Sequence, residues 1–231
     1  MNDDELIRLH ADVLYIYDEH GRMVRSNEPD GKPAPRVHLC QTRDSYLLRF
    51  GQTLPADVAE RVSERVQTHW SRGPLRPLET VREEIRLILE QQSPTSRVSA
   101  GPIYRFPAAV PVPGDVVQVT GENLEITRDT YPWLLDELPA WWPCFAVVRD
   151  GAAVSLCFSS RIGSSACEAG VHTLRAFRGR GFAASVTAAW AVAVRAGNRI
   201  PLYSTSWENL ASQAVARRLG LTVIGSEMIW T

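Results

Sequence analysis

The stretch from Gly181 to Gly197, GFAASVTAAWAVAVRAG, most constrains the fold, because it is apolar nearly all round and has the composition of a helix. A helix without a polar face must be covered on most sides, so we expect it to be buried against a sheet and to end at Gly197. Its apolar run, from Phe182 to Val194, is shorter than the ~20 residues that a membrane span needs. The stretch therefore predicts the centre of a globular domain.

The segments around this helix have the patterns of strands and of one further helix. CFAVVRDGAAVSLCFSS (144–160) predicts a hairpin that turns at Asp150–Gly151, and ACEAGVHTL (166–174) predicts a third strand. After the helix come a strand, IPLYSTSW, a helix, NLASQAVARRLG, and a last strand, LTVIGSEMIW. This order predicts a mixed sheet with helices packed on it.

The first half of the chain has the pattern of a small α+β unit. ADVLYIYDEHGRMV (11–24) predicts a hairpin that turns at Asp18–Gly21, and the segments 55–70 and 77–92 have helical spacing. The polar, Pro- and Gly-containing segment 91–102 is a plausible joint. We therefore expect an N-terminal α+β domain over 1–97, for which no role is predicted, and a second domain over 98–231.

Composition narrows the function classes. The net charge of −1 argues against a large nucleic-acid surface, and the acidic start of the chain lacks the apolar core of a signal peptide. We expect a cytoplasmic protein without a nucleic-acid or membrane partner. The four histidines of the first half, His10, His20, His38 and His69, have no metal-ligand spacing, so no metal is expected. The four cysteines include no C-x-x-C pair and are interpreted as buried thiols; they are Cys40, Cys144, Cys157 and Cys167.

The segment Arg178–Gly181, R-G-R-G, lies between a predicted strand and the apolar helix. The start of a helix leaves backbone N–H groups without intrahelical partners and carries positive potential, and glycines let a ligand approach the backbone. These features suit a pyrophosphate. A structural turn with solvated arginines is the alternative that stays open. A nucleic-acid contact would need a wider basic field, and the glycine spacing does not fit a dinucleotide fingerprint.

The downstream sequence adds a second pattern. R-G-R-G-F-A, a helix, a strand and then N-x-x-S-x-x-V-x-x-x-L-G-L resemble the GNAT N-acetyltransferase superfamily over about 144–225. The resemblance implies a mixed, mostly antiparallel central sheet with flanking helices, and a small additional N-terminal α+β domain. It also implies transfer of an acetyl group from acetyl-CoA to a small-molecule or peptide amine. Arg178, Gly181 and Ala183 fill the defined positions of the family's pyrophosphate motif. The cofactor-binding residues that it implies are Val171, His172, Thr173, Arg178, Gly179, Arg180, Gly181, Phe182, Ala183, Asn209 and Ser212.

The same resemblance implies the catalytic residues. Glu168 is the candidate base, although it lies about one residue from the expected position, which a β-bulge in its strand would correct. The alternative is an exposed carboxylate at a strand end. His172 lies on the same face by alternation and is a candidate proton relay. The family's tyrosine general acid is Ala216 here, so the candidate acids are Tyr203, Ser204 or water.

Other interpretations stay open at this stage. The alternative function is a non-catalytic acyl-CoA-binding module whose N-terminal domain docks a partner, and a homodimer is compatible with the sequence. Cys157 has no evident base partner that would make it a nucleophile. Trp133, Trp141 and Trp142 are expected either to line an acceptor pocket or to form core or a domain interface.

Overall fold

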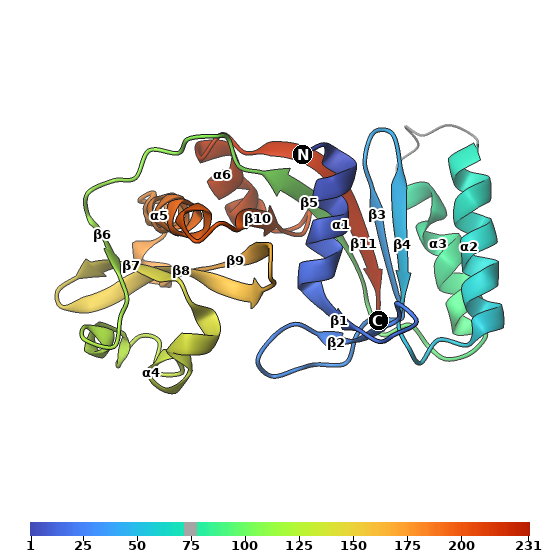
Figure 1. The fold of residues 1–231 in the computed structure, drawn as a ribbon, viewed down its shortest axis with the longest axis horizontal. Coiled ribbons are helices and arrows are strands. Elements are labelled where there is room, and N and C mark those ends of the chain that lie inside the picture. Colours follow the sequence, from blue (N-terminus) through green and yellow to red (C-terminus); the bar gives the residue numbers. More distant parts are fainter. Residues whose placement is uncertain (72–77) are drawn as a thin grey trace. The chain divides into compact units, whose positions relative to one another are not determined.

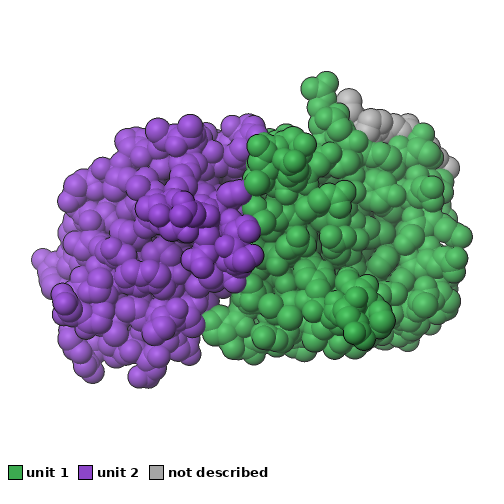
Figure 2. All heavy atoms as spheres, in the orientation of Figure 1, with its two compact units in different colours: residues 1–103, 205–208, 223–231 green, residues 104–204, 209–222 purple. Residues whose placement is uncertain are grey.

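The computed structural model describes residues 1–71 and 78–231, so residue 77, where the second predicted N-terminal helix was expected to begin, lies outside the described residues. The chain divides into two compact units (Figure 2). Unit 1 contains Met1–Ile103, Thr205–Glu208 and Val223–Thr231, and unit 2 contains Tyr104–Ser204 and Asn209–Thr222. This division differs from the expected one at 97/98. The reason is that the last strand, β11 (Thr222–Trp230), pairs with a strand of the N-terminal half.

Unit 1 begins with a helix that the sequence analysis missed. Helix α1 (Asp3–Leu14) starts at a capping box, in which the Asn2 side chain accepts from the Glu5 backbone and the Glu5 side chain accepts from the Asn2 backbone. The prediction of a strand from residue 11 was therefore wrong for 11–14. The predicted hairpin is confined to β1 (Tyr15–Tyr17) and β2 (Met23–Ser26), which pair antiparallel.

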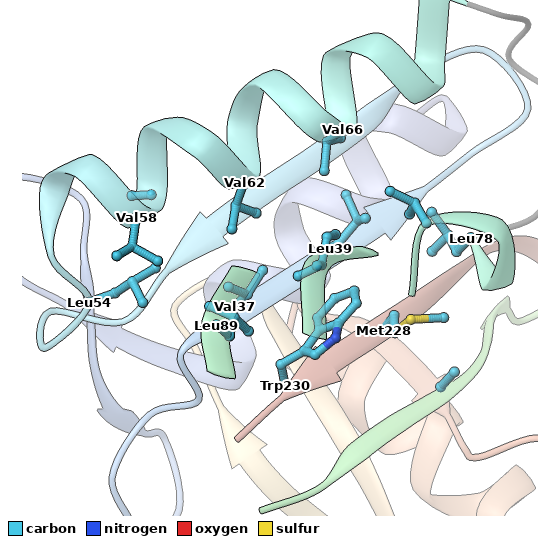
Figure 3. Packing of buried hydrophobic residues seen from close by; sticks show 14 residues of the cluster. Val37, Leu39, Leu54, Val58, Val62, Val66, Leu78, Leu89, Met228 and Trp230 are labelled. Atoms are coloured by element: carbon cyan, nitrogen blue, oxygen red, sulfur yellow. The ribbon is translucent and has the colours of Figure 1, made fainter. Parts of the chain in front are cut away.

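The main sheet of unit 1 has the order β4-β3-β11-β5, with the bounds β3 Val37–Gln41, β4 Tyr46–Phe50 and β5 Val98–Arg105. Both predicted helices are confirmed as α2 (Ala56–Ser71) and α3 (Glu79–Glu90). Figure 3 shows how Val58, Val62 and Val66 of α2 point toward the strands. They meet a row of alternating residues on β3 and β11, which is Val37, Leu39, Met228 and Trp230. The residues between these, on the same strands, therefore lie on the opposite face of the sheet.

Unit 2 is a sheet of order β10-β9-β8-β7-β6 with helices on both faces, and this mixed, mostly antiparallel architecture confirms the expected fold class. Its strands are β6 (Val116–Gln118), β7 (Cys144–Arg149), β8 (Ala152–Ile162), β9 (Ala166–Thr173) and β10 (Ile200–Ser204). Only the β9–β10 pairing in this set is parallel. Its helices and helical turns are η1 (Leu124–Thr127), α4 (Leu134–Glu137), η2 (Leu138–Trp141), η3 (Arg175–Phe177), α5 (Phe182–Ala196) and α6 (Leu210–Arg218).

The apolar helix occupies the predicted position. Figure 1 shows α5 on one face of strands β7–β9 and α4 on the other. Trp190 of α5 is fully buried and its indole nitrogen donates to the hydroxyl of Ser159 on β8 at 3.0 Å. The predicted hairpin turn is also confirmed, since Asp150 and Gly151 both have positive φ, 51° and 80°. Within the described residues, the helices are too short or too polar to span a bilayer.

Candidate active site

The two parallel strands of unit 2 separate partway along their length. The register of β9 against β10 runs from Ala166 opposite Ile200 to Glu168 opposite Leu202. Strand β9 continues five residues further, to Thr173, without a partner in that register. The backbone groups of Ala169 to Thr173 on the edge away from β8 therefore have no strand partner in that register, and they are available to an extended ligand.

The loop that follows β9 is held open by two glycines. Gly179 and Gly181 have φ of 77° and 86°, values that favour glycine, and Gly181 caps the N-terminus of α5. The backbone N–H groups of the first turn, including those of Phe182 and Ala183, point along the helix axis into this loop. The loop thus combines an approachable backbone with the positive end of a long helix.

A further cation from α6 reaches the same point. A Cβ atom built on Gly181 would lie 2.8 Å from Cζ of Arg218, so the Arg218 guanidinium packs directly against the glycine at the start of α5. A cation at the positive end of a helix is unfavourable by itself, so this arrangement suits an anion between them. The sequence alone does not indicate Arg218 as a site residue, because it lies 37 positions after Gly181 and belongs to no part of the loop motif.

The two loop arginines are exposed and turn back onto their own segment. Nε of Arg178 donates to the carbonyl of Thr173 at 3.1 Å, which ties the loop to the end of β9. The guanidinium of Arg180 donates to the carbonyl of Ala176 at 3.3 Å and lies 5.2 Å from the ring centroid of Phe177. Both side chains remain exposed to solvent and are free to reorient toward a ligand.

Glu168 is buried at the point where β9 and β10 separate, with a relative exposure of 2%. Its Oε1 accepts two hydrogen bonds from Ser204 at the end of β10, from the backbone N–H at 2.7 Å and from the hydroxyl at 2.9 Å. It is therefore not the exposed strand-end carboxylate of the alternative interpretation. The expected bulge in β9 was wrong: the extra residue is Ser160 of β8, between the pairs Ser159–Ala169 and Arg161–Glu168.

The residues of β9 alternate between two faces. Cys167, Ala169 and Val171 pack into the core that contains α5, so Glu168, Gly170 and His172 share the opposite face, as predicted for Glu168 and His172. Beside them lies a group of rings that we call the aromatic face, formed by Tyr131, Trp133, Trp141 and Phe158.

Rings of the aromatic face lie directly over β9. Trp133, Trp141 and Phe158 make three mutual edge contacts, with centroids 5.3 to 5.5 Å apart. A Cβ atom at Gly170 would lie 2.5 Å from Cε2 of Phe158, so only glycine accommodates that ring. The ring of His172 contacts Tyr131 at 5.3 Å. Trp133 and Trp141 are thus brought together against Phe158 of β8, and Trp142 is 41% exposed.

Tyr203 and Ser212 form a separate pair. The Tyr203 hydroxyl lies 2.6 Å from Oγ of Ser212, and the ring is buried in the core that contains α5, together with Ala216. Burial raises the pKa of the Tyr203 hydroxyl, although its hydrogen bond with Ser212 acts in the opposite direction. Asn209 caps α6 by accepting from the Ser212 backbone at 3.0 Å.

The cysteines match the interpretation from sequence. All four are buried and none forms a disulfide. Burial raises the pKa of the Cys157 thiol well above its ordinary value, which opposes formation of a nucleophilic thiolate.

Comparison with known proteins adds one decisive observation. Residues 144–226 match the model of the family described as GNAT acetyltransferase. This part of the chain belongs to the GNAT acetyltransferase family. The match covers β7 to most of β11, including the separated strands, the glycine loop and α6. The match supports acyltransferase activity. No curated protein matches the chain.

Several solved structures are similar to this chain at low identity. A GNAT-family acetyltransferase from Novosphingobium aromaticivorans is 18% identical, with 59% of this chain and 65% of that chain covered and a TM-score of 0.46. A GCN5-related N-acetyltransferase-like protein from Streptococcus suis is 16% identical, with both chains fully covered and a TM-score of 0.48. An aminoglycoside N-acetyltransferase in complex with CoA is 27% identical, with 48% and 92% covered and a TM-score of 0.38.

Proposed function

We propose that this protein transfers an acetyl group from acetyl-CoA to an amine. The observation that carries the proposal is the loop at the start of α5, where Gly179 and Gly181 adopt left-handed backbone and the guanidinium of Arg218 packs against Gly181. A loop of this kind suits the diphosphate of CoA, because it offers several N–H donors and one fixed cation in a small volume. Arg178 and Arg180 add two mobile cations at its rim.

Acetyl-CoA, the acyl donor, would contact strand β9 as well as the loop. A pantetheine arm that leaves the diphosphate would run along the edge of β9 from Thr173 toward Ala169, where β10 has diverged. A backbone N–H of Val171, His172 or Thr173 would then polarise the thioester carbonyl. Ser212 and Asn209 lie at the start of α6 and would contact the same arm, although the Asn209 carbonyl already caps the helix.

Glu168 is the proposed base. An amine of ordinary pKa is mostly protonated at neutral pH and must lose a proton before its nitrogen attacks the thioester carbon. The carboxylate of Glu168, fixed by two bonds from Ser204, would accept that proton, with exposed His172 as a relay to solvent. A C–N bond then forms, the C–S bond breaks and CoA departs as the thiolate.

The departing thiolate does not depend on a fixed acid. A thiolate has a conjugate-acid pKa near ~8.5, so it leaves readily and takes a proton from water. Tyr203 is the remaining side-chain candidate, but its hydroxyl is engaged by Ser212 at 2.6 Å. We therefore expect Tyr203→Phe to retain most of the turnover.

The acceptor is proposed to be a small-molecule or peptide amine with an apolar part that packs on the aromatic face. That group lies beside Gly170 and on the same side of β9 as Glu168, so an amine resting on the rings would have its nitrogen near the base. Aromatic surfaces also attract ammonium groups, which favours binding of the protonated amine.

The test combines binding with turnover. Calorimetry with CoA and acetyl-CoA measures the affinity of the protein for the donor. The rate of thiol release from acetyl-CoA across an amine panel measures turnover. We expect Glu168→Gln to keep acetyl-CoA affinity and to lose turnover by about 100-fold or more. If tight acetyl-CoA binding is accompanied by no turnover with any amine, the non-catalytic module replaces the enzyme. If neither CoA nor acetyl-CoA binds, the proposal fails altogether.

A further inference from the structure

Unit 1 contains a buried cluster of metal-binding side chains that acyl transfer does not use. His10 of α1, His38 of β3 and Glu227 of β11 each present one ligand atom, and these atoms lie within 4.8 Å of one another. Oε2 of Glu227 is 3.1 Å from Nε2 of His10 and 2.8 Å from Nε2 of His38. The histidines are completely buried and Glu227 is 7% exposed.

The sheet register brings these groups together. Cys40 lies directly opposite Glu227 in the antiparallel β3–β11 pair, and His38 is two residues before Cys40 on the same face. This is the face opposite the apolar row of Leu39, Met228 and Trp230. Because the sequence separations from Glu227 are 217 and 189 residues, no short-range spacing could reveal the set.

A fourth candidate ligand lies beside the three. Sγ of Cys40 is 3.2 Å from Nε2 of His38, the same nitrogen that lies 2.8 Å from Glu227. If that nitrogen carries a proton directed at the carboxylate, it has no lone pair left for the thiol proton. The sulfur then acts at most as a weak second acceptor of that N–H. It lies outside the three atoms that converge within 4.8 Å, so it would reach a shared ion only after its side chain rotates.

The charges also suit a divalent ion. Burial alone would raise the pKa of Glu227, but charge attraction to the neighbouring imidazoles and their hydrogen bonds hold it well below its ordinary value. A thiol loses its proton when a divalent cation binds it. One carboxylate and one thiolate neutralise a 2+ ion, and a neutral set is what a fully buried site requires.

We propose that His10, His38 and Glu227 bind a divalent transition-metal ion of the zinc type, with the thiolate of Cys40 as the fourth ligand after rotation of its side chain. Two imidazoles, a carboxylate and a thiolate form a donor set that Zn²⁺ takes in tetrahedral geometry. From the usual bond lengths, the edges of such a site are about 3.3 Å between nitrogen and oxygen and about 3.6 Å between nitrogen and sulfur, so the observed separations need to widen by a few tenths of an ångström. Binding releases the thiol proton and any proton on the ligating nitrogens.

This proposal replaces the expectation of no metal, which rested only on the absence of a spacing motif. The ion would join α1, β3 and β11, and so would fasten the first and last elements of the chain to one sheet. Its role would be structural and separate from the proposed acyl transfer, since all four side chains belong to unit 1.

The test uses the full-length protein without a polyhistidine tag, stripped with a chelator and titrated with Co²⁺. We expect one Co²⁺ per chain with the visible bands of four-coordinate cobalt, a near-ultraviolet thiolate–cobalt band, and displacement by Zn²⁺. His38→Ala should abolish the spectrum, whereas His20→Ala, at a histidine whose side chain is 78% exposed, should leave it unchanged.

Cys40→Ser keeps the test valid if His38→Ala does not fold. It should lose the near-ultraviolet band and retain the visible bands. The proposal is overturned if excess Co²⁺ or Zn²⁺ changes neither the spectrum nor the melting temperature of the stripped protein. It is also overturned if the wild-type spectrum lacks the thiolate band, or if His20→Ala and His38→Ala bind Co²⁺ alike.

Discussion

Replacing Gly181 with alanine perturbs two properties of the donor loop at once. The new Cβ must occupy a residue with φ of 86°, and it would lie 2.8 Å from the guanidinium carbon of Arg218. Gly179→Ala is the matched control, because Gly179 has φ of 77° and a Cβ there meets nothing within 4 Å. Both variants therefore strain the backbone, and only one displaces Arg218.

The two contributions have separate magnitudes. Left-handed backbone costs an ordinary residue roughly 1–2 kcal/mol, which lowers the melting temperature of a chain of this size by about 2–8 °C in either variant. Loss of a hydrogen bond between a guanidinium and a phosphate costs about 1.5–3 kcal/mol, or roughly 10- to 150-fold in affinity. We therefore expect similar stability losses in both variants and a much larger loss of CoA affinity in Gly181→Ala.

The assay is calorimetry with CoA on a double-mutant cycle of Gly181→Ala and Arg218→Ala, with thermal melts of each protein. If the alanine acts through Arg218, it should weaken CoA binding strongly in the wild type and only slightly once Arg218 is gone. Equal losses in both backgrounds would refute the assignment of Arg218 to the anion site. Equal CoA affinity of Gly179→Ala and Gly181→Ala would refute it as well.

Two further substitutions test the acceptor side and the core of unit 1. Gly170→Ala should push the Phe158 ring from its place, because the new Cβ would lie 2.5 Å from Cε2 of that ring. In steady-state kinetics we expect a raised KM for the amine and an unchanged affinity for CoA. Gly121→Ala is the control and should change neither quantity, because a Cβ there meets nothing within 4 Å. Leu39→Ala removes a fully buried side chain from the core in Figure 3. In urea titrations it should lower the free energy of unfolding by about 2–5 kcal/mol. Leu87→Ala is the control and should have little effect, because the Leu87 side chain is 52% exposed.

Local patterns predicted most elements of the fold. The apolar helix, the hairpin at Asp150–Gly151 and the helix α2 each follow from periodicity or turn chemistry within a few residues, so neighbouring sequence was sufficient. Helix α1 was missed because the apolar, Tyr-rich residues after it favour a strand, and the capping box at Asn2 and Glu5 was not recognised. The inclusion of β11 in unit 1 depends on a different kind of contact. Strand β11 completes its sheet through pairing with β3, a contact between the two ends of the chain that no local pattern encodes.

The same distinction separates the two sides of the candidate active site. The glycine loop is contiguous, and glycines occupy its two positions of positive φ, so the sequence predicted its backbone shape, whereas its binding of acetyl-CoA stays a prediction. Arg218 and the aromatic face reach the site from other elements, and only the fold shows that they lie beside Gly181 and Gly170.

This difference has a consequence for specificity. Acetyl-CoA would be bound through Arg218 and through backbone N–H groups, whose positions a side-chain substitution changes little. The acceptor would instead rest on side chains from the segment between η1 and α4, from η2 and from β8, which gather around the Phe158 ring above Gly170 of β9. Substitutions in those short elements should therefore alter the choice of amine while leaving the affinity for CoA intact, because they touch neither the loop nor the separated edge of β9.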